Sequence, residues 1–91
     1  MNTTIHKQVI KISEKPYEIT VPTGSIMLAA QCQHGELTVW YHFTAGVSTQ
    51  TVFHFLVVRT GWETNLEGYA YLDTIQRGPY IWHVFFAEVP F

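Results

Sequence analysis

The sequence predicts an all-β protein, a small antiparallel sandwich or barrel of about seven strands that forms one domain over residues 1–91. Short runs rich in β-branched and aromatic residues alternate with turn residues along the whole chain. No segment combines helix caps with an apolar stripe repeating every 3.6 residues. Seven such runs at this spacing are typical of a small sandwich or barrel.

The first predicted strand covers residues 4–13. Its side chains alternate, with Ile5, Lys7, Val9 and Lys11 on one face, and both faces are part polar. We therefore expect a half-exposed edge strand that its lysines protect from pairing with other chains. The dipeptide 15–16, Lys-Pro, ends it because proline cannot donate to a ladder.

A hairpin is predicted in the middle of the chain. A second strand over residues 17–21 and a tight turn over 22–25 lead into it. The runs 26–33 and 36–43 flank the two-residue connection 34–35, His-Gly. Glycine supplies the positive φ that such a connection requires, so these runs pair as an antiparallel hairpin.

The second half of the chain contains three further predicted strands. A loop of small residues covers 44–50, a strongly apolar strand 51–59, and the longest irregular stretch 60–68. Strands over 69–76 and 80–88 then form a second hairpin around Arg77-Gly78-Pro79.

The run 80–86 is apolar on both faces of its strand. Successive side chains point to opposite faces, so two sets separate. One face carries Tyr80, Trp82, Val84 and Phe86, and the other carries Ile81, Phe85 and Ala87, with His83 as its polar interruption. A chain of 91 residues cannot easily cover both faces, so we expect the second face to meet another subunit or a ligand.

The amino-acid composition also indicates contacts with another subunit. Hydrophobic residues make up 47% and charged residues only 13%, which is more apolar surface than a small core needs. We therefore expect a homo-oligomer. A net charge of −2 with five scattered Lys and Arg residues gives no basic footprint, so duplex nucleic acid is not an expected partner.

The expected compartment is the cytoplasm. The single cysteine, Cys32, rules out an internal disulfide framework and fits a reducing environment. The first residues lack the pattern of a signal peptide, and the longest apolar run, residues 55–58, is far too short to span a bilayer. A membrane is therefore not an expected partner.

Several separated motifs resemble those of a family of short, uncharacterised β-proteins from tailed phages and prophages. The resemblance covers roughly residues 5–86. It is carried by Pro22-x-Gly24-Ser25-Ile26-Met27-Leu28, Gln31-x-Gln33-x-Gly35, Val39-Trp40, Arg59-Thr60-Gly61, Tyr71-Leu72-Asp73-Thr74-Ile75-Gln76 and Trp82-His83-Val84-Phe85. The resemblance implies a small accessory phage protein, of a size common among inhibitors of host defence, and it implies no catalytic residues.

The best candidate site is Arg59-Thr60-Gly61-Trp62, where a predicted strand ends. A guanidinium binds phosphate in a bidentate manner, a hydroxyl and a glycine N–H add donors, and an indole stacks on a base. The aromatic residues Trp40, Tyr71 and Trp82 could complete a nucleotide-binding site. The plainer interpretation is a surface arginine, a turn glycine and a tryptophan that packs over the end of the fold.

Metal binding and catalysis have weaker signals. His42, His54, His83 and Cys32 lie on four predicted strands, but their spacing matches no common ligand pair, so no metal or other cofactor is expected. Cys32 is better interpreted as a small buried hydrophobic residue. No serine lies in a nucleophile-elbow context and no acid pair has a distinctive spacing, so an enzyme is not expected.

Two functions remain. The first is a non-enzymatic binding protein that sequesters a nucleotide-like host signal, in sites formed between subunits. The second is a protein-interaction module whose exposed aromatic face docks on a host protein and inhibits it. A stoichiometric complex with a small ligand would indicate the first, and a complex with a protein the second.

Overall fold

The computed structural model describes residues 1–89 and contains seven strands with no helix among those residues. The strands are β1 (Thr3–Val9), β2 (Tyr17–Pro22), β3 (Ile26–Gln33), β4 (Glu36–Thr44), β5 (Gln50–Arg59), β6 (Ala70–Arg77) and β7 (Tyr80–Val89). The predicted all-β class and strand number are confirmed. The last two residues of the domain predicted over 1–91 lie outside the described residues.

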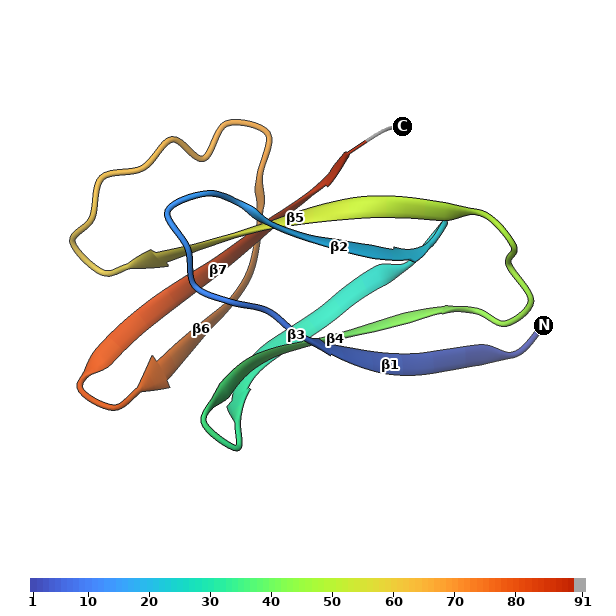
Figure 1. Ribbon diagram of the computed structural model, residues 1–91, viewed down its shortest axis with the longest axis horizontal. Coiled ribbons are helices and arrows are strands. Elements are labelled where there is room, and N and C mark those ends of the chain that lie inside the picture. Colours follow the sequence, from blue (N-terminus) through green and yellow to red (C-terminus); the bar gives the residue numbers. More distant parts are fainter. Residues whose placement is uncertain (90–91) are drawn as a thin grey trace.

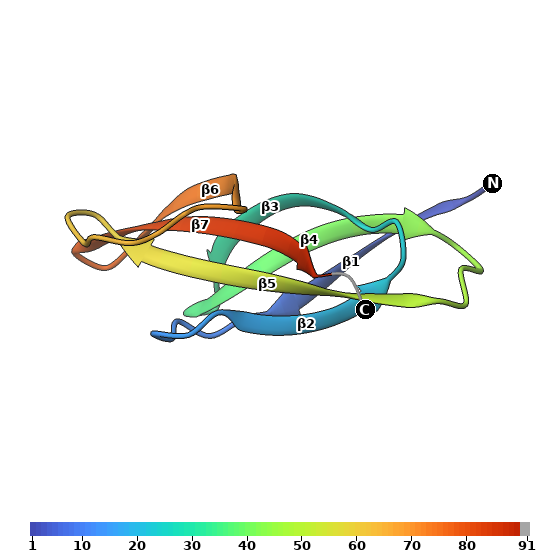
Figure 2. The same ribbon diagram turned by 90° about the horizontal axis from the view of Figure 1, so that it is seen from above.

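The strands form two antiparallel sheets that pack as a sandwich (Figures 1 and 2). One sheet has three strands in the order β1-β4-β3, and the other has four in the order β2-β5-β7-β6. Because β7 pairs with both β5 and β6, those two strands run parallel to each other. The connection 60–69 must therefore cross β7 to reach the start of β6.

The core lies between the two sheets, where alternate side chains of the central strands point inward. Phe53, Phe55 and Val57 of β5 are buried against residues of the other sheet such as Val39 of β4. Phe55 is the largest of the fully buried side chains. The core therefore rests mainly on the two central strands, β4 and β5.

One flank of the sandwich is closed by β3 and β6. Each of these edge strands carries a β-bulge, at Leu28 and at Leu72. The Asp73 carboxylate next to the second bulge accepts the N–H of Ala30 on β3 at 3.1 Å, and its other oxygen accepts the N–H of Thr74 at 2.9 Å. Because bulges bend a strand out of its ladder, they bring one sheet edge against the other here.

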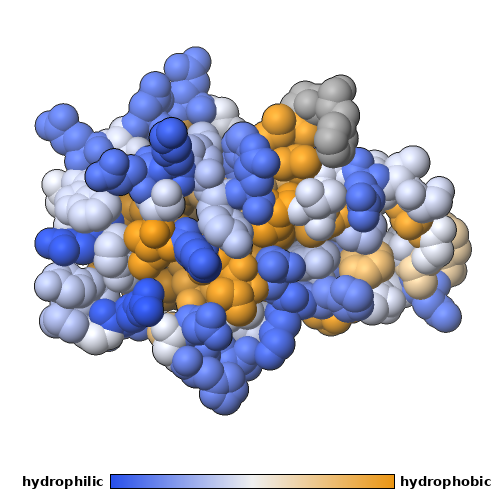
Figure 3. Space-filling view, viewed as in Figure 1, coloured by the Kyte–Doolittle hydropathy of each residue, from blue (hydrophilic) through white to orange (hydrophobic). Residues whose placement is uncertain are grey.

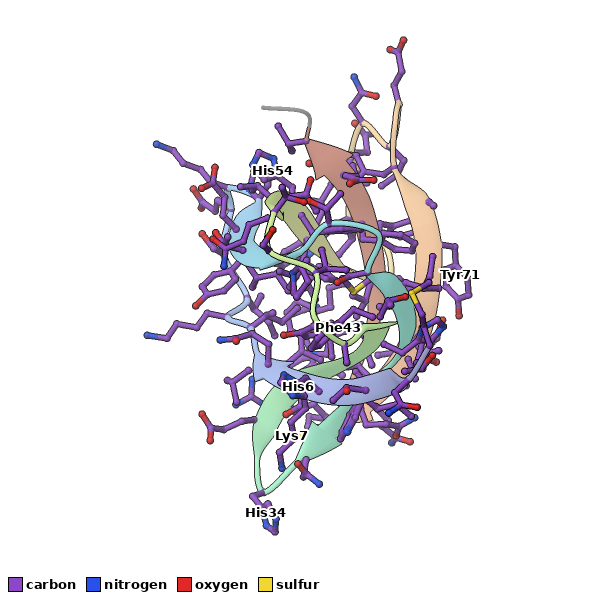
Figure 4. The ribbon with its side chains drawn as sticks, turned by 90° about the vertical axis from the view of Figure 1, so that its right-hand side faces the viewer. His6, Lys7, His34, Phe43, His54 and Tyr71 are labelled. Atoms are coloured by element: carbon purple, nitrogen blue, oxygen red, sulfur yellow. The ribbon has the colours of Figure 1, made fainter. Side chains whose placement is uncertain are left out.

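The connection 34–35 closes the predicted hairpin. His34 has φ 52° and Gly35 has φ 79°, and two consecutive positive values are typical of a type I′ turn. Figure 4 shows His34 at the tip of this hairpin, away from the sheets. The predicted hairpin is confirmed, and its two residues have the backbone twist that suits right-handed strands.

The first strand is shorter than predicted, since β1 ends at Val9 rather than Ser13. The chain leaves the sheet there because Ile10 is buried in the core and Ile12 packs against it. Apolar side chains in residues 10–12 thus carry the chain from the three-stranded sheet toward the other one. Alternation alone did not reveal this crossing.

The two apolar faces of β7 have different surroundings. Trp82, Val84 and Phe86 face the core, as the alternation predicts. On the outer face, Phe85 is half-buried and its ring packs edge-on against Tyr71 of β6, with centroids 5.8 Å apart. Part of the second face is therefore covered by the chain's own β6. Apart from β7, apolar patches lie between polar side chains on the side of the molecule drawn in Figure 3.

No helix in the described part of the chain is long and apolar enough to cross a membrane.

Candidate functional site

An arginine and three aromatic side chains gather where β5 ends and β7 begins. We call Arg59, Trp62, Tyr80 and Trp82 the arginine–aromatic cluster. Arg59 is the last residue of β5 and pairs with Trp82 in the ladder. Tyr80 lies two residues before Trp82, on the same face of β7. Paired and diagonal neighbours on one face of a sheet lie within reach of long side chains, so the register alone brings these groups together.

The rings and the guanidinium are in contact. The Arg59 guanidinium carbon lies 4.4 Å from the centre of the Tyr80 ring and 5.5 Å from that of Trp62. The rings of Trp62 and Trp82 meet edge-to-face with centroids 5.6 Å apart. Trp62 is 52% exposed and Tyr80 46%. A cation is thus held between two aromatic rings that solvent can still reach.

A second arginine lies on β6, on the other side of β7 from the first. Arg77 of β6 is directly opposite Tyr80 in the ladder. Among residues 1–89, the only ion pair joins His54 to Glu18 at 2.9 Å, so neither Arg59 nor Arg77 has a carboxylate partner. Arg77 also borders a hollow of about 200 Å³ whose lining includes Lys11 and one carboxylate, that of Glu36. Three of the five basic residues therefore lie near this end of the sandwich.

The opposite face of the same sheet carries a chain of polar side chains. Thr60 Oγ1 lies 2.7 Å from His83 Nε2, and Thr74 Oγ1 lies 3.1 Å from His83 Nδ1. The Tyr71 hydroxyl is 2.7 Å from Thr74 Oγ1. We call these four residues the threonine–histidine chain. Both ring nitrogens have a hydroxyl partner, so the chain fixes the orientation of the imidazole across β6 and β7.

A hollow of about 280 Å³ adjoins Trp62 on the side of β5. Its lining contains Glu14 and Glu63 as well as the apolar Leu56 and Val58. Two carboxylates in its lining disfavour a phosphate there. An anionic ligand would therefore bind on the Tyr80 side of Arg59, where the second arginine lies.

The structure brings together some of the residues that the sequence singled out and separates others. Arg59, Trp62 and Trp82 form one cluster. Thr60 and Tyr71 belong instead to the threonine–histidine chain on the other face, where Thr60 contacts His83 and Tyr71 contacts Thr74. Gly61 has φ 93° and makes the turn that returns Trp62 toward Arg59, with the N–H of Trp62 donating to the Arg59 carbonyl at 3.0 Å.

Trp40 lies apart from all of these residues. It is on β4 of the three-stranded sheet, where it pairs with Lys7 and Ala29. Its neighbours Val39 and Tyr41 face the core, so the Trp40 side chain points to the outside of that sheet. Of the two tryptophans in the cluster, Trp82 is on β7 of the other sheet and Trp62 lies in the connection that follows β5.

The candidate metal ligands are also dispersed. His54 pairs with Glu18, His83 lies between two threonines, and His42 is on β4. Within residues 1–89, no three histidine, cysteine, aspartate or glutamate side chains are placed to share an ion. Cys32 is half-buried opposite Leu37, less buried than a core residue.

The sequence interpretation missed Tyr80, Arg77 and His83 as members of these clusters. The alternation of β7 puts Tyr80 on the face of Trp82, and that signal was available. The pairing of Arg77 with Tyr80 follows from the hairpin at residues 78–79. The role of His83 depends on the order β5-β7-β6, which no local pattern encodes.

Sequence comparison identifies the family. No curated protein and no solved structure matches the chain. The profile of one protein family, described as a domain of unknown function (DUF7352), matches residues 1–90, nearly the whole chain. The protein therefore belongs to the DUF7352 family.

Proposed function

We propose that the protein is a non-enzymatic binding protein that captures a nucleotide-like anion at the arginine–aromatic cluster. The observation that supports this most is the position of the Arg59 guanidinium, 4.4 Å from the Tyr80 ring and without a carboxylate partner among residues 1–89. An unpaired guanidinium binds phosphate oxygens through charge-assisted hydrogen bonds. Contact with the two rings restricts the Arg59 side chain before a ligand arrives, which lowers the entropic cost of binding.

The exposed rings supply the second half of the recognition. Trp62 and Tyr80 each leave about half of the side chain accessible. A base that stacks on an aromatic ring contributes about 1–3 kcal/mol without a requirement for a particular sequence or base. Arg77 opposite Tyr80 provides a second positive charge for a ligand with more than one phosphate.

The biological setting that we propose is phage defence. A small phage-encoded protein that binds a nucleotide messenger in the cytoplasm of the host cell would sequester that signal and counter host immunity. The resemblance to short phage and prophage proteins motivates the origin, and the low charge fraction of 13% motivates a homo-oligomer.

A second candidate function is docking on a host protein. The hollow beside Trp62 is small, about 280 Å³, and two exposed aromatic side chains, Trp62 and Tyr80, lie at this end of the four-stranded sheet. Tryptophan, tyrosine and arginine are the residues that dominate protein interfaces. In this alternative the same cluster contacts a protein side chain in place of a base.

Calorimetric titration against a panel of cyclic and ADP-ribose-type nucleotides tests the proposal. Arg59→Ala removes a contact worth roughly 1.5–3 kcal/mol, so the affinity should fall at least tenfold. Arg59→Lys keeps the charge but loses the planar guanidinium, so its affinity should lie between those of the unmodified protein and Arg59→Ala. Trp62→Ala should weaken binding by about 1–3 kcal/mol.

Two control variants separate the site from general effects. Lys7→Ala removes one positive charge, and Trp40→Ala removes one tryptophan, both on the three-stranded sheet. Both should bind like the unmodified protein. No heat of binding from the unmodified protein across the panel would reject the nucleotide and leave the docking function.

A further inference from the structure

The four sheet edges differ in how well they are protected against another chain. Edge strands commonly avoid unwanted pairing through bulges, prolines, charges or cover from a neighbouring element. β3 and β6 have bulges and are joined through Asp73 and Ala30. β2 has only six residues, ends at Pro22 and follows Pro16. β1 has seven residues with no bulge and no proline.

β1 is also the least buried strand. Five of its seven residues are exposed and none is buried, so both of its faces are in contact with solvent. Ile5 is 62% exposed. In the part of the chain that the structure describes, β4 is the only strand with which β1 pairs. Side-chain packing therefore stabilises β1 little, and the strand is held mainly by its backbone hydrogen bonds to β4.

The outward backbone groups of β1 can be assigned. The N–H of Ile10 donates to Leu37 at 2.9 Å, and the N–H of Ala45 donates to Asn2 at 2.9 Å. Hydrogen-bonded residues alternate along an antiparallel ladder, so even-numbered residues face β4. The N–H and C=O groups of Thr3, Ile5, Lys7 and Val9 therefore point away from the sheet, and none has a hydrogen-bond partner within residues 1–89.

Lys7 does not protect this edge as the sequence suggested. Its ammonium donates to the Gln33 side chain at 2.7 Å. Gln33 is on β3, beyond β4, so the lysine reaches across the outer face of its own sheet and away from the free edge. In Figure 4, β1 lies at the front of the molecule, with His6 and Lys7 labelled. The only charged side chain of β1 is thus held clear of an incoming strand.

We propose that β1 pairs with β1 of a second copy, antiparallel, and joins two three-stranded sheets into one of six strands. This interface deepens the homo-oligomer of the proposed function and rests on it. A second copy fits because an identical strand presents the same four outward residues. With the two-fold axis at His6, Thr3 pairs with Val9 of the second copy and Ile5 with its Lys7, which leaves none of those outward groups unpaired.

Neighbouring side chains support the same interface. Ile5 and Ile26 both pair with His42, so they lie in one row across the outer face of the sheet. Both isoleucines are more than half exposed. Self-pairing of β1 places Lys7 of the second copy directly opposite Ile5 and the second copy's Ile5 diagonally from it, which covers part of each Ile5 side chain. Apolar burial thereby adds to about eight new backbone hydrogen bonds.

A matched pair of variants tests the interface. Lys7→Pro removes an outward N–H and leaves the even-numbered residues that bond to β4 in place, as prolines on edge strands do. Lys7→Ala loses the same side chain but keeps the N–H. In sedimentation at micromolar concentration, the unmodified protein and Lys7→Ala should be dimers or larger, and Lys7→Pro should dissociate at least ten times more readily.

Each outcome has a distinct meaning. An oligomer that persists in a folded Lys7→Pro would reject the β1 edge but keep the homo-oligomer. A single 10.5 kDa species from the unmodified protein would reject both. If Lys7→Pro does not fold, hydrogen exchange of the unmodified protein tests the β1 interface instead. The amides of Ile5 and Lys7 should be protected in concentrated samples and exposed on dilution, and protection that is absent at every concentration would overturn the interface.

Discussion

The two flanks of the sandwich are built differently. On one flank, bulges at Leu28 and Leu72 turn β3 and β6 toward each other, and Asp73 joins them through the backbone of Ala30. On the other flank, β1 is exposed on both faces and its outward backbone groups have no partner among the described residues. The closed flank is complete within one chain, whereas the open flank has the features of a surface that another molecule covers.

This difference separates the stability of the isolated chain from the stability of its assembly. Residues near the closed flank and the core should determine whether the isolated chain folds. Residues of β1 should matter little to the isolated chain and much to its assembly. Substitutions near the closed flank should therefore lower the free energy of unfolding, and substitutions in β1 should lower the mass of the assembly. The following predictions are ordered by the size of the effect.

The largest expected effect is in the core. Phe55 is 1% exposed, and Phe55→Ala should lower the free energy of unfolding by about 3–5 kcal/mol because it removes the buried ring and leaves a cavity. Denaturant unfolding measures the loss. The matched change on the open flank, Ile5→Ala, should cost the monomer less than about 0.5 kcal/mol. Similar losses from both would contradict the contrast between core and open flank.

The next effect is at the closed flank. Asp73→Ala removes the acceptor of two backbone N–H groups, including that of Ala30, which is fully buried. A buried donor without a partner is costly, so we expect a loss of roughly 2–4 kcal/mol in urea unfolding. Asp73→Asn retains one carbonyl oxygen and should lose less. No loss in Asp73→Ala would show that the flank is not held by this residue.

A third effect concerns the β3–β4 hairpin. Gly35→Val should cost on the order of 1–2 kcal/mol, since a β-branched residue is strained at positive φ. No atom lies within 4 Å of an added Cβ, so the strain comes from the backbone and not from a clash. Gly35→Asn should cost less because asparagine tolerates this conformation. Equal melting temperatures for Val and Gly would contradict the assigned turn.

The smallest effect depends on pH. Burial raises the pKa of the Tyr41 phenol above its usual value of 10.0. The unfolded chain therefore ionises first, so the contribution of Tyr41 to stability is present below about pH 10 and lost as the pH rises above that value. The unmodified protein should lose slightly more stability than Tyr41→Phe between neutral and strongly alkaline pH. Parallel stability curves for the two proteins would exclude the effect.

Much of the fold could be predicted from the sequence because its signals are local. The alternation of β7 and the His-Gly turn at 34–35 each depend on residues close together in the chain, and both agree with the structure. The end of β1 was missed because Ile10 and Ile12 continue the alternation while the backbone leaves the sheet. Periodicity cannot distinguish a strand from an extended crossing segment.

The candidate site was harder to predict because it depends on strand order. Arg59 and Trp62 are near in sequence and are in contact through the turn at Gly61. Tyr80 joins them only because β7 lies beside β5, which is a long-range pairing, whereas Arg77 lies opposite Tyr80 through the local hairpin at residues 78–79. Trp40 was grouped with them by residue type, and its strand belongs to the other sheet. Long-range pairing of this kind leaves no trace in a local pattern.

We propose that one chain of this protein is an incomplete functional unit that binds a second copy and an anionic ligand. A native mass spectrum of the protein purified from its natural source tests both parts at once. We predict a mass of at least twice 10.5 kDa, together with bound mass that nucleotides account for. A single species of 10.5 kDa with no bound mass would contradict the claim.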